Sequence, residues 1–176
     1  LLNEDPGQKL KLVAVTGTNG KTTVATLVAS ILEQSNVPAG FIGTTGYRFG
    51  STSYEASHTT PSAIRVYELL NQMYTAGCRS CAMEASSHAL DQIRFRTEDV
   101  NVAVFTNLTR DHLDYHGTFE SYFQSKKRLF DELPTTSTGV VNLDDPKGHS
   151  MASDSQASIL SFGQTGAADI RYSIVE

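Results

Sequence analysis

The sequence is short of the residues and patterns that mark several classes of protein. Among 176 residues there is no tryptophan, and only two residues are cysteine. No apolar run approaches the ~20 residues of a membrane span, and no signal-peptide pattern is present. The scarcity of cysteine excludes a disulfide-stapled scaffold, and the short apolar runs exclude membrane insertion. We therefore expect a cytoplasmic protein.

Positive charge is also in deficit. The chain has 14 lysines and arginines against 19 aspartates and glutamates, which gives a net charge of −5. Proteins that bind nucleic acid or anionic membranes along a broad surface normally carry a basic excess, so we expect no nucleic-acid partner and only a local site for phosphate. What is present is an ordinary globular composition, 39% hydrophobic and 19% charged, in a chain long enough for one sizeable core.

The two cysteines, Cys78 and Cys81, are spaced C-x-x-C, which is compatible with a redox or metal pair. No second pair of ligands follows them, and they fall at an apparent strand over residues 79–83. A reduced cytosolic protein often buries free cysteine as a small hydrophobic residue. We therefore expect two free, buried thiols.

The most informative stretch is T-G-T-N-G-K-T-T at residues 16–23, where an apolar run ends and an amphipathic helical pattern begins. Its two glycines let the backbone turn sharply around an anion, and the N-terminus of the following helix offers unpaired N–H groups. Lys21 supplies a charge for the outer phosphates, and the hydroxyl of Thr22 is placed to bind Mg²⁺. Val15 stands where the P-loop pattern G-x-x-x-x-G-K-[ST] has its first glycine. We predict a phosphate-binding loop rather than a plain strand-to-helix turn.

Strands and helices alternate along the rest of the chain. Strands are predicted near residues 10–15, 41–44, 79–84, 100–106, 139–142 and 159–162, with a turn or hairpin over 46–53. Helices are predicted over about 20–35, over a segment that Thr60 caps and Pro61 begins, and over about 118–133. The expected buried faces are Val24, Leu27, Val28, Ile31 and Leu32 in the first helix and Val66, Leu69, Leu70, Met73 and Tyr74 in the second. This alternation predicts an α/β fold with a mainly parallel sheet flanked by helices, in which ligands collect at the carboxyl ends of the strands.

Polar residues follow these strands where they end. Glu84 comes directly after an apolar strand, as an acidic metal ligand would, and the segment from Asn107 to His112 follows the next strand. Mg²⁺ prefers oxygen ligands and shares them with phosphates, so Thr22 and Glu84 are the predicted pair of ligands. The alternative for Glu84 is a carboxylate that is merely exposed at a strand end. His112 is a candidate metal ligand because the residues around it are dense in Asn, Arg and Asp.

The helix predicted at 118–133 carries a lysine on its apolar side. That side consists of Phe119, Tyr122, Phe123, Leu129, Phe130 and Leu133. At about 100° per residue Lys126 falls in the middle of this stripe, whereas Lys127 and Arg128 point away from it. Desolvation would lower the pKa of Lys126 and make a neutral amine available for chemistry. The alternative is that its long side chain snorkels to solvent, and the sequence alone leaves the two interpretations equal.

Five motifs together resemble the central, ATP-binding domain of the Mur ligase family. They are T-G-T-N-G-K-T-T at 16–23, H-T-T-P at 58–61, M-E-A-S-S-H-A-L-D-Q-I-R at 83–94, F-T-N-L-T-R-D-H-L-D-Y-H-G at 105–117 and Y-F-Q-S-K at 122–126. The second and third motifs resemble the tripeptide-forming type, which adds the third amino acid to UDP-N-acetylmuramoyl-dipeptide. Folylpolyglutamate synthetases resemble the first motif but usually read G-K-G-S where this chain has G-K-T-T.

The resemblance implies a P-loop NTPase-like α/β domain and a set of site residues. ATP would be held by Thr18, Asn19, Gly20, Lys21, Thr22 and Thr23, one Mg²⁺ by Thr22 and Glu84, and a second Mg²⁺ with the help of His112. The UDP-muramyl-peptide would be contacted by Thr59, Thr60, Ser86, Gln92 and Arg94. Lys126 matches the position that carries a CO₂-derived carbamate in the family, which would turn this lysine into an anion able to bind a cation. The implied catalytic residues are Lys21, His112 and Lys126.

The implied reaction is ATP-dependent amide formation in peptidoglycan precursor synthesis. A substrate carboxylate attacks the γ-phosphate to give an acyl phosphate, and the amine of diaminopimelate or lysine then displaces phosphate, with Lys21 and Mg²⁺ neutralising the repelling anions. The family has three domains, so residues 1–176 would be the central one without its uridine-nucleotide and C-terminal domains, and would have little activity alone. Two alternatives remain open: another family member such as a folylpolyglutamate synthetase, and a nucleotide-binding module without ligase chemistry.

Overall fold

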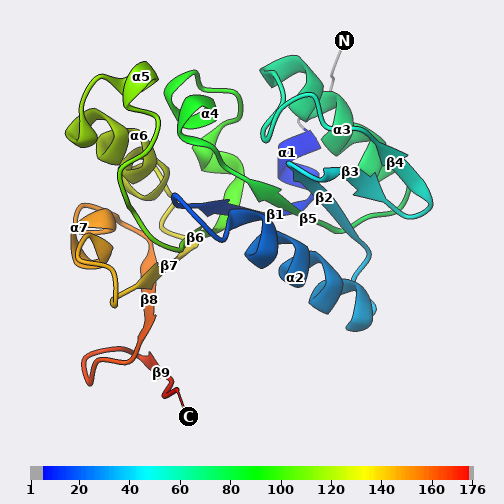
Figure 1. The fold of residues 1–176 in the computed structure, drawn as a ribbon. Coiled ribbons are helices and arrows are strands. Elements are labelled where there is room, and N and C mark those ends of the chain that lie inside the picture. The colour runs from blue at the N-terminus through cyan, green and yellow to red at the C-terminus, as the bar shows by residue number, and fades with distance from the viewer. Residues whose placement is uncertain (1–5, 175–176) are drawn as a thin grey trace.

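The structure, a computed structural model, describes residues 6–174 (Figure 1). Its elements in chain order are α1 (Pro6–Lys9), β1 (Lys11–Thr16), α2 (Lys21–Gln34), β2 (Ala39–Gly43), β3 (Gly46–Phe49), β4 (Thr52–Tyr54), α3 (Ala63–Thr75), β5 (Ser80–Glu84), α4 (Ser87–Asp91), a 3₁₀ turn (Thr97–Asp99), β6 (Val100–Phe105), α5 (Leu113–His116), α6 (Phe119–Asp131), β7 (Thr138–Asn142), α7 (Gly148–Met151), β8 (Ser158–Gly163) and β9 (Ile170–Arg171). Within these residues no helix has both the length and the apolar character needed to cross a bilayer.

The nine strands form one sheet in the order β4-β3-β2-β5-β1-β6-β7-β8-β9. Among the described strands, the neighbours along β2-β5-β1-β6-β7-β8-β9 pair in parallel. The strands at the other edge, β2-β3-β4, pair in antiparallel fashion. The strand β1 lies between β5 and β6, with Val15 level with Glu84 on one side and Thr16 level with Phe105 on the other. The loops that follow these three strands therefore leave the sheet side by side, at the edge where open α/β sheets bind ligands.

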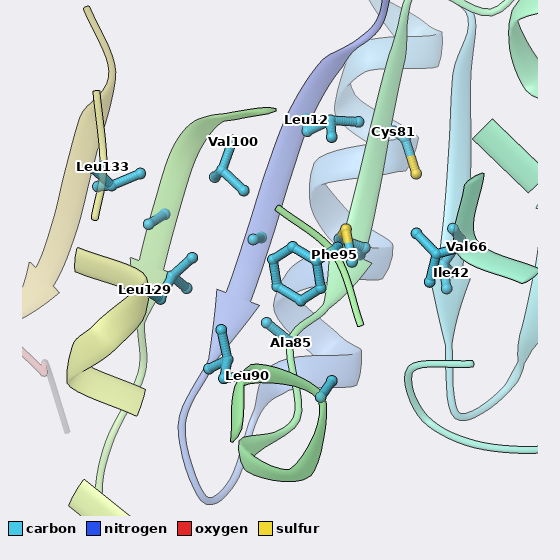
Figure 2. Close-up of a cluster of buried hydrophobic side chains, with 14 of the residues drawn as sticks. Leu12, Ile42, Val66, Cys81, Ala85, Leu90, Phe95, Val100, Leu129 and Leu133 are labelled. Carbon is cyan, nitrogen blue, oxygen red and sulfur yellow. The ribbon is translucent and has the colours of Figure 1, made fainter. Parts of the chain in front are cut away.

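Helices cover both faces of the sheet, as the α/β pattern predicts. The helix α2 lies on one face, and α3, α4 and α6 lie on the other (Figure 1). The larger core cluster fills the space under α3, α4 and α6, and it extends across the sheet from Leu129 to Val66, with Phe95 between them (Figure 2). A smaller cluster under α2 consists of Val15, Ala25, Ala29, Ala39, Phe41 and Ala82. The predicted mainly parallel sheet with flanking helices is confirmed.

The buried face of α2 differs from the prediction at two of its five residues. Val24, Val28 and Leu32 are partly buried and pack against the smaller core cluster, as predicted. Leu27 and Ile31 are 55% and 62% exposed, and the fully packed positions are Ala25 and Ala29. Two residues correspond to about 200° around a helix, so Leu27 and Ile31 lie nearly opposite the alanines. The small alanine side chains let the helix axis approach the sheet, and the branched residues are left facing solvent.

The start of α3 is also corrected. The N-cap is Ser62 and the first helical residue is Ala63, so Thr60 is not the cap and Pro61 is not the first residue of the helix. The hydroxyl of Thr60 instead donates to the backbone oxygen of Glu84 at 2.6 Å and accepts from the N–H of Ser86 at 3.1 Å. Four of the five residues predicted on the buried face are buried, whereas Tyr74 is 38% exposed.

The two cysteines behave as the composition predicts. Cys78 and Cys81 are free and buried, and Cys81 points into the main core from β5 (Figure 2). Burial raises the pKa of both thiols, which disfavours the reactive thiolate. They are structural side chains of the core.

Candidate active site

The predicted phosphate-binding loop connects β1 to α2. Gly17 has a φ of 145° and Gly20, the N-cap of α2, has a φ of 84°, a region that favours glycine. A Cβ on Gly17 would lie 2.0 Å from Oγ1 of Thr106, so only glycine lets the loop pack this closely against the end of β6. The backbone oxygen of Asn107 accepts a hydrogen bond from the N–H of Thr18 at 2.8 Å. The loop is thus held in shape by the residues that follow β6.

The departure from the full P-loop pattern is the valine at the position of the first glycine, and the structure explains it. Val15, which replaces the first glycine, is a fully buried residue of β1. The turn therefore begins only at Gly17, and the loop is shorter than the eight-residue pattern. The residues predicted to bind ATP, Thr18 to Thr23, all lie in this turn or at the start of α2.

Lys21 folds back over its own loop. Its Nζ donates to the backbone oxygens of Gly17 at 2.9 Å and Thr18 at 2.8 Å. Burial lowers the pKa of Lys21 below its usual 10.5, and the charges of Glu84 and Asp111 oppose that shift. The hydrogen-bond partners of this partly desolvated ammonium within residues 6–174 are neutral carbonyls, so it would gain from binding an anion, because charge-assisted hydrogen bonds are stronger.

Glu84 ends β5 and is only 1% exposed, so the interpretation of an exposed carboxylate is wrong. Its Oε2 accepts from the hydroxyl of Thr22 at 3.0 Å, and its Oε1 accepts from the N–H of Thr44 at 2.7 Å. Gly43 makes room for the carboxylate, because a Cβ there would lie 2.3 Å from Oε1. The two residues predicted to bind Mg²⁺ therefore contact each other at the start of α2.

The residues predicted to contact the muramyl-peptide gather beyond Glu84. Thr59, Thr60, Ser86 and Arg94 line a pocket of about 300 Å³ together with His58, His88 and His112. Gln92 and Arg94 line a second pocket of about 570 Å³. The Oγ1 of Thr60 donates to the backbone oxygen of Glu84 at 2.6 Å and accepts from the N–H of Ser86 at 3.1 Å. Glu84 thus presents its carboxylate to the phosphate-binding loop and its backbone to this pocket.

His112 is the N-cap of the short helix α5 and has a left-handed backbone with φ of 50°. Its ring lies 5.0 Å from the ring of His88, and its Nε2 lies 3.5 Å from Oδ2 of Asp111. Across the described part of the chain, no three side chains of the His, Cys, Asp and Glu types converge to hold a metal ion by themselves. A cation would therefore need the hydroxyl of Thr22, phosphate oxygens or a further anion in its shell.

Lys126 is 1% exposed, so it does not snorkel to solvent. Its Nζ donates to the backbone oxygen of Gly17 at 3.0 Å and lies 4.7 Å from the centre of the Tyr122 ring. Burial, with a smaller contribution from the charge of Lys21, lowers its pKa from 10.5 to about 7, and the charge of Asp111 opposes the shift. The structure therefore brings an amine that is partly neutral near pH 7 onto the phosphate-binding loop.

A sequence model of the Mur ligase middle domain matches residues 15–176. The chain belongs to the Mur ligase family. It is 41% identical over 177 residues to the UDP-N-acetylmuramoyl-L-alanyl-D-glutamate--2,6-diaminopimelate ligase of Geobacter metallireducens, with 97% of this chain and 35% of that protein covered. The protein of the same name from Chlorobaculum tepidum is 49% identical over 144 residues, with 82% of this chain and 28% of that protein covered. The chain thus spans about a third of the length of these curated relatives.

Solved structures place this Mur ligase chain in the same fold. A structure of a UDP-N-acetylmuramoyl-L-alanyl-D-glutamate--2,6-diaminopimelate ligase superposes with a TM-score of 0.81 at 37% identity, over 91% of this chain and 33% of that one. The Escherichia coli protein FolC in complex with DHPP and ADP has a TM-score of 0.65 at 19% identity, over 90% of this chain and 44% of that one. At that identity FolC shows only that the fold is shared. The family and the fold implied by the five motifs are confirmed.

One lysine of the Mur ligase chain lies where the helical pattern did not place it. Lys127, predicted to point away from the apolar stripe, is only 6% exposed. Its Nζ donates to Oδ1 of Asp131 and, at 2.6 Å, to Oδ2 of Asp154. Because α6 packs against α4, α5 and α7, more than one side of it is covered. Lys127 is therefore the buried member of ion pairs with two more exposed aspartates, next to the candidate functional lysine.

Two residues that hold the site were not singled out from the sequence. The hydroxyl of Tyr122 lies 3.1 Å from Oγ1 of Thr18, so this tyrosine of the apolar stripe also contacts the loop. Asp145 accepts from the N–H of Leu108 at 2.7 Å and fixes the segment after β6. Asp145 lies just after the end of β7. The rule that parallel strands present their carboxyl ends at one edge would have been sufficient to predict its place near the site.

Proposed function

We propose that this chain supplies the ATP-binding part of an amide-bond ligase of peptidoglycan precursor synthesis, which adds diaminopimelate or lysine to UDP-N-acetylmuramoyl-L-alanyl-D-glutamate. The observation that carries the proposal is the position of Glu84 between two sites. Its carboxylate accepts from Thr22 at the phosphate-binding loop, and its backbone oxygen accepts from Thr60 in the neighbouring pocket. The carboxylate of a substrate bound in that pocket would lie next to the phosphates of a nucleotide bound at the loop. The names of the relatives at 41% and 49% identity support the choice of reaction.

The loop and the start of α2 would hold ATP. Thr18, Asn19, Gly20 and Thr23 would surround the phosphates with backbone N–H groups and hydroxyls, at the positive end of the α2 dipole. Lys21 would exchange its two carbonyl partners for phosphate oxygens. Bound Mg²⁺, held by Thr22 and Glu84, would neutralise charge between the phosphates. The burial of Glu84 keeps its carboxylate fixed for this role.

The two pockets would bind the nucleotide-linked dipeptide. Arg94 would pair with an anionic group of this substrate, because its planar guanidinium suits a carboxylate or a phosphate. Thr59, Thr60, Ser86 and Gln92 would supply hydroxyl and amide groups around it. The substrate carboxylate would then attack the γ-phosphate, and the incoming amine would displace phosphate from the resulting acyl phosphate.

Lys126 would act as a carbamate. The ammonium first loses one proton. The neutral lysine nitrogen then attacks the carbon of CO₂, an N–C bond forms as one C=O π bond of CO₂ opens to a carboxylate oxygen, and a second proton leaves the nitrogen, so that a cation becomes an anion. The lowered pKa of Lys126, about 7, supplies the neutral amine that this step needs. The resulting carboxylate-like group, together with His112, would supply oxygen and nitrogen ligands for a second cation, for which no three His, Cys, Asp or Glu side chains converge within residues 6–174.

The test is ATP-dependent phosphate release by the protein at its natural length. We expect release that needs both UDP-N-acetylmuramoyl-L-alanyl-D-glutamate and one amino acid, and a loss of roughly a hundredfold or more in Lys21→Ala. Lys11→Ala, at the other end of β1, removes an exposed lysine and should stay within about twofold. Release that needs a folate substrate instead would support a folylpolyglutamate synthetase, and ATP binding without any acceptor-dependent release would support a nucleotide-binding module.

A further inference from the structure

The turn that carries Gln92 and Arg94 is strained. After α4 the N–H of Arg94 donates to the backbone oxygen of Ala89 at 2.9 Å and the N–H of Ile93 to that of Leu90 at 3.3 Å, the pattern of a Schellman helix end. That motif places a left-handed residue at the turn, and here it is Ile93 with a φ of 50°. A β-branched residue is disfavoured in this region of φ and ψ, and Ile93 is 56% exposed. Such a turn persists only where its surroundings hold it.

The side chain of Arg94 is held on two sides. Its Nη1 donates to the backbone oxygen of Thr60 at 2.6 Å, and its Nε and Nη2 both donate to Oε1 of Gln92, at 3.0 and 2.8 Å. The second contact requires the oxygen of the Gln92 amide to face the guanidinium. With the amide rotated by half a turn, two sets of donors would face each other. The direction in which Arg94 points thus depends on the orientation of the Gln92 amide.

The hydroxyl of Tyr115 determines this orientation. It donates its single proton to Oδ2 of Asp91 at 2.7 Å, so toward Gln92 it acts only as an acceptor. The Nε2 of Gln92 donates to it at 3.0 Å, which leaves Oε1 for Arg94. The Tyr115 ring is in turn seated on the ring of His88, with centroids 4.1 Å apart.

We propose that Tyr115 is a positioning residue, which fixes the Gln92 amide and through it aims the Arg94 guanidinium at an anionic group of the acceptor substrate. This inference rests on the proposed function, because it assigns Arg94 to that substrate. Tyr115 belongs to α5 and lies three positions after His112, the N-cap of that helix, so the same short helix supports both the acceptor pocket and the candidate metal side.

The test compares two tyrosines that have the same kind of partner. Tyr115→Phe removes the hydroxyl and keeps the ring on His88. Tyr172→Phe is the control, because it removes a hydroxyl near the far end of the sheet that donates to Oδ2 of Asp144 at 2.7 Å, the same length as the bond from Tyr115 to Asp91. In the protein at its natural length we expect Tyr115→Phe to raise KM for UDP-N-acetylmuramoyl-L-alanyl-D-glutamate by about tenfold, with KM for ATP within about twofold. Tyr172→Phe should leave both KM values unchanged.

A double-mutant cycle shows whether Tyr115 acts through Gln92. In a Gln92→Ala background Tyr115→Phe should add less than about twofold, because its target is already absent. A full additional effect there, or an equal rise in KM for ATP, would overturn the proposal.

A second readout needs no substrate. We expect the Nε–H of Arg94 to exchange with solvent at least several-fold faster in Tyr115→Phe, measured by ¹⁵N NMR. An unchanged exchange rate would overturn the positioning role whatever the enzyme does. Absence of turnover by the wild-type protein would refute only the proposed function.

Discussion

Replacing Lys126 with methionine tests the charge state of the buried amine. The substitution keeps a long unbranched side chain on the apolar stripe and removes the titrating group. In the folded protein burial lowers the pKa of Lys126 from 10.5 to about 7, with Lys21 adding to the shift and Asp111 opposing it. Below about pH 7 the protein must therefore keep a charge that its surroundings disfavour, and Lys126→Met should be more stable there than the wild type.

The sign of the pH dependence follows from proton binding. Between about pH 7 and 10.5 the unfolded chain holds the proton on Lys126 and the folded chain does not, so the free energy of unfolding rises with pH. Over the range from about pH 7 to about 9.5 this difference amounts to about 3 kcal/mol in favour of the wild type. The advantage of Lys126→Met over the wild type should shrink by that amount over the same range.

The neighbouring lysine provides a matched control. Burial opposes the charge of Lys127 too, but its hydrogen bonds to Asp131 and Asp154 outweigh burial and raise its pKa. Its contribution to stability is then fully present below the unfolded pKa and is lost only as pH rises through the higher folded value. Lys127→Met should therefore lower stability by the same amount at both pH values.

The assay is urea unfolding of the wild type, Lys126→Met and Lys127→Met at about pH 7 and at about pH 9.5. The buffers are freed of CO₂ so that no carbamate forms. Groups distant from Lys126 contribute equally to wild type and variants, so the difference between the curves reports Lys126 together with its repulsion from Lys21. If wild type and Lys126→Met change in parallel between the two pH values, the amine of Lys126 is not desolvated. The structural basis for its proposed chemistry then fails.

Two further outcomes follow from single positions. Gly17→Ala should lower the free energy of unfolding by at least about 2 kcal/mol, because its Cβ would lie 2.0 Å from Oγ1 of Thr106 on a backbone with φ of 145°. The control is Gly166→Ala, because nothing lies within 4 Å of a Cβ at that position. Urea unfolding of this control should show a change below about 0.5 kcal/mol. A thiol reagent such as DTNB should label neither Cys78 nor Cys81 in the native protein and both in urea, since burial raises the pKa of each thiol; rapid labelling of the native protein would contradict their place in the core.

The sequence was sufficient for the parts of the site that depend on local chemistry and on one topological rule. The spacing of Gly17, Gly20 and Lys21 predicted the loop between β1 and α2, and the structure has it there. Parallel strands present their carboxyl ends at one edge of the sheet, and this rule alone predicted that Glu84, after one strand, would lie near Thr22, after another. In both cases the deciding forces act within a few residues or between adjacent strands.

The predictions that failed depended on what covers each helix. The pattern of α2 shows one apolar stripe, but the sheet contacts the alanines beside it and leaves Leu27 and Ile31 exposed. The pattern of α6 assumes one covered side, whereas the helix packs against α4, α5 and α7, so that Lys127 is buried. Helical periodicity gives the spacing of apolar residues and does not give the number of neighbours around the helix.

Lys21 and Lys126 bring two lysine ammonium groups together in a chain with a net charge of −5, as the proposed anion site requires. Both ammonium groups donate to the same backbone oxygen, that of Gly17, at 2.9 and 3.0 Å. Two cations on one neutral acceptor repel each other, and the charge of Lys21 contributes to the lowered pKa of Lys126. This repulsion is relieved when Lys21 pairs with a phosphate, or when Lys126 loses its charge. The composition predicts that any phosphate site must be local, and the shared carbonyl of Gly17 is where that local positive charge is concentrated.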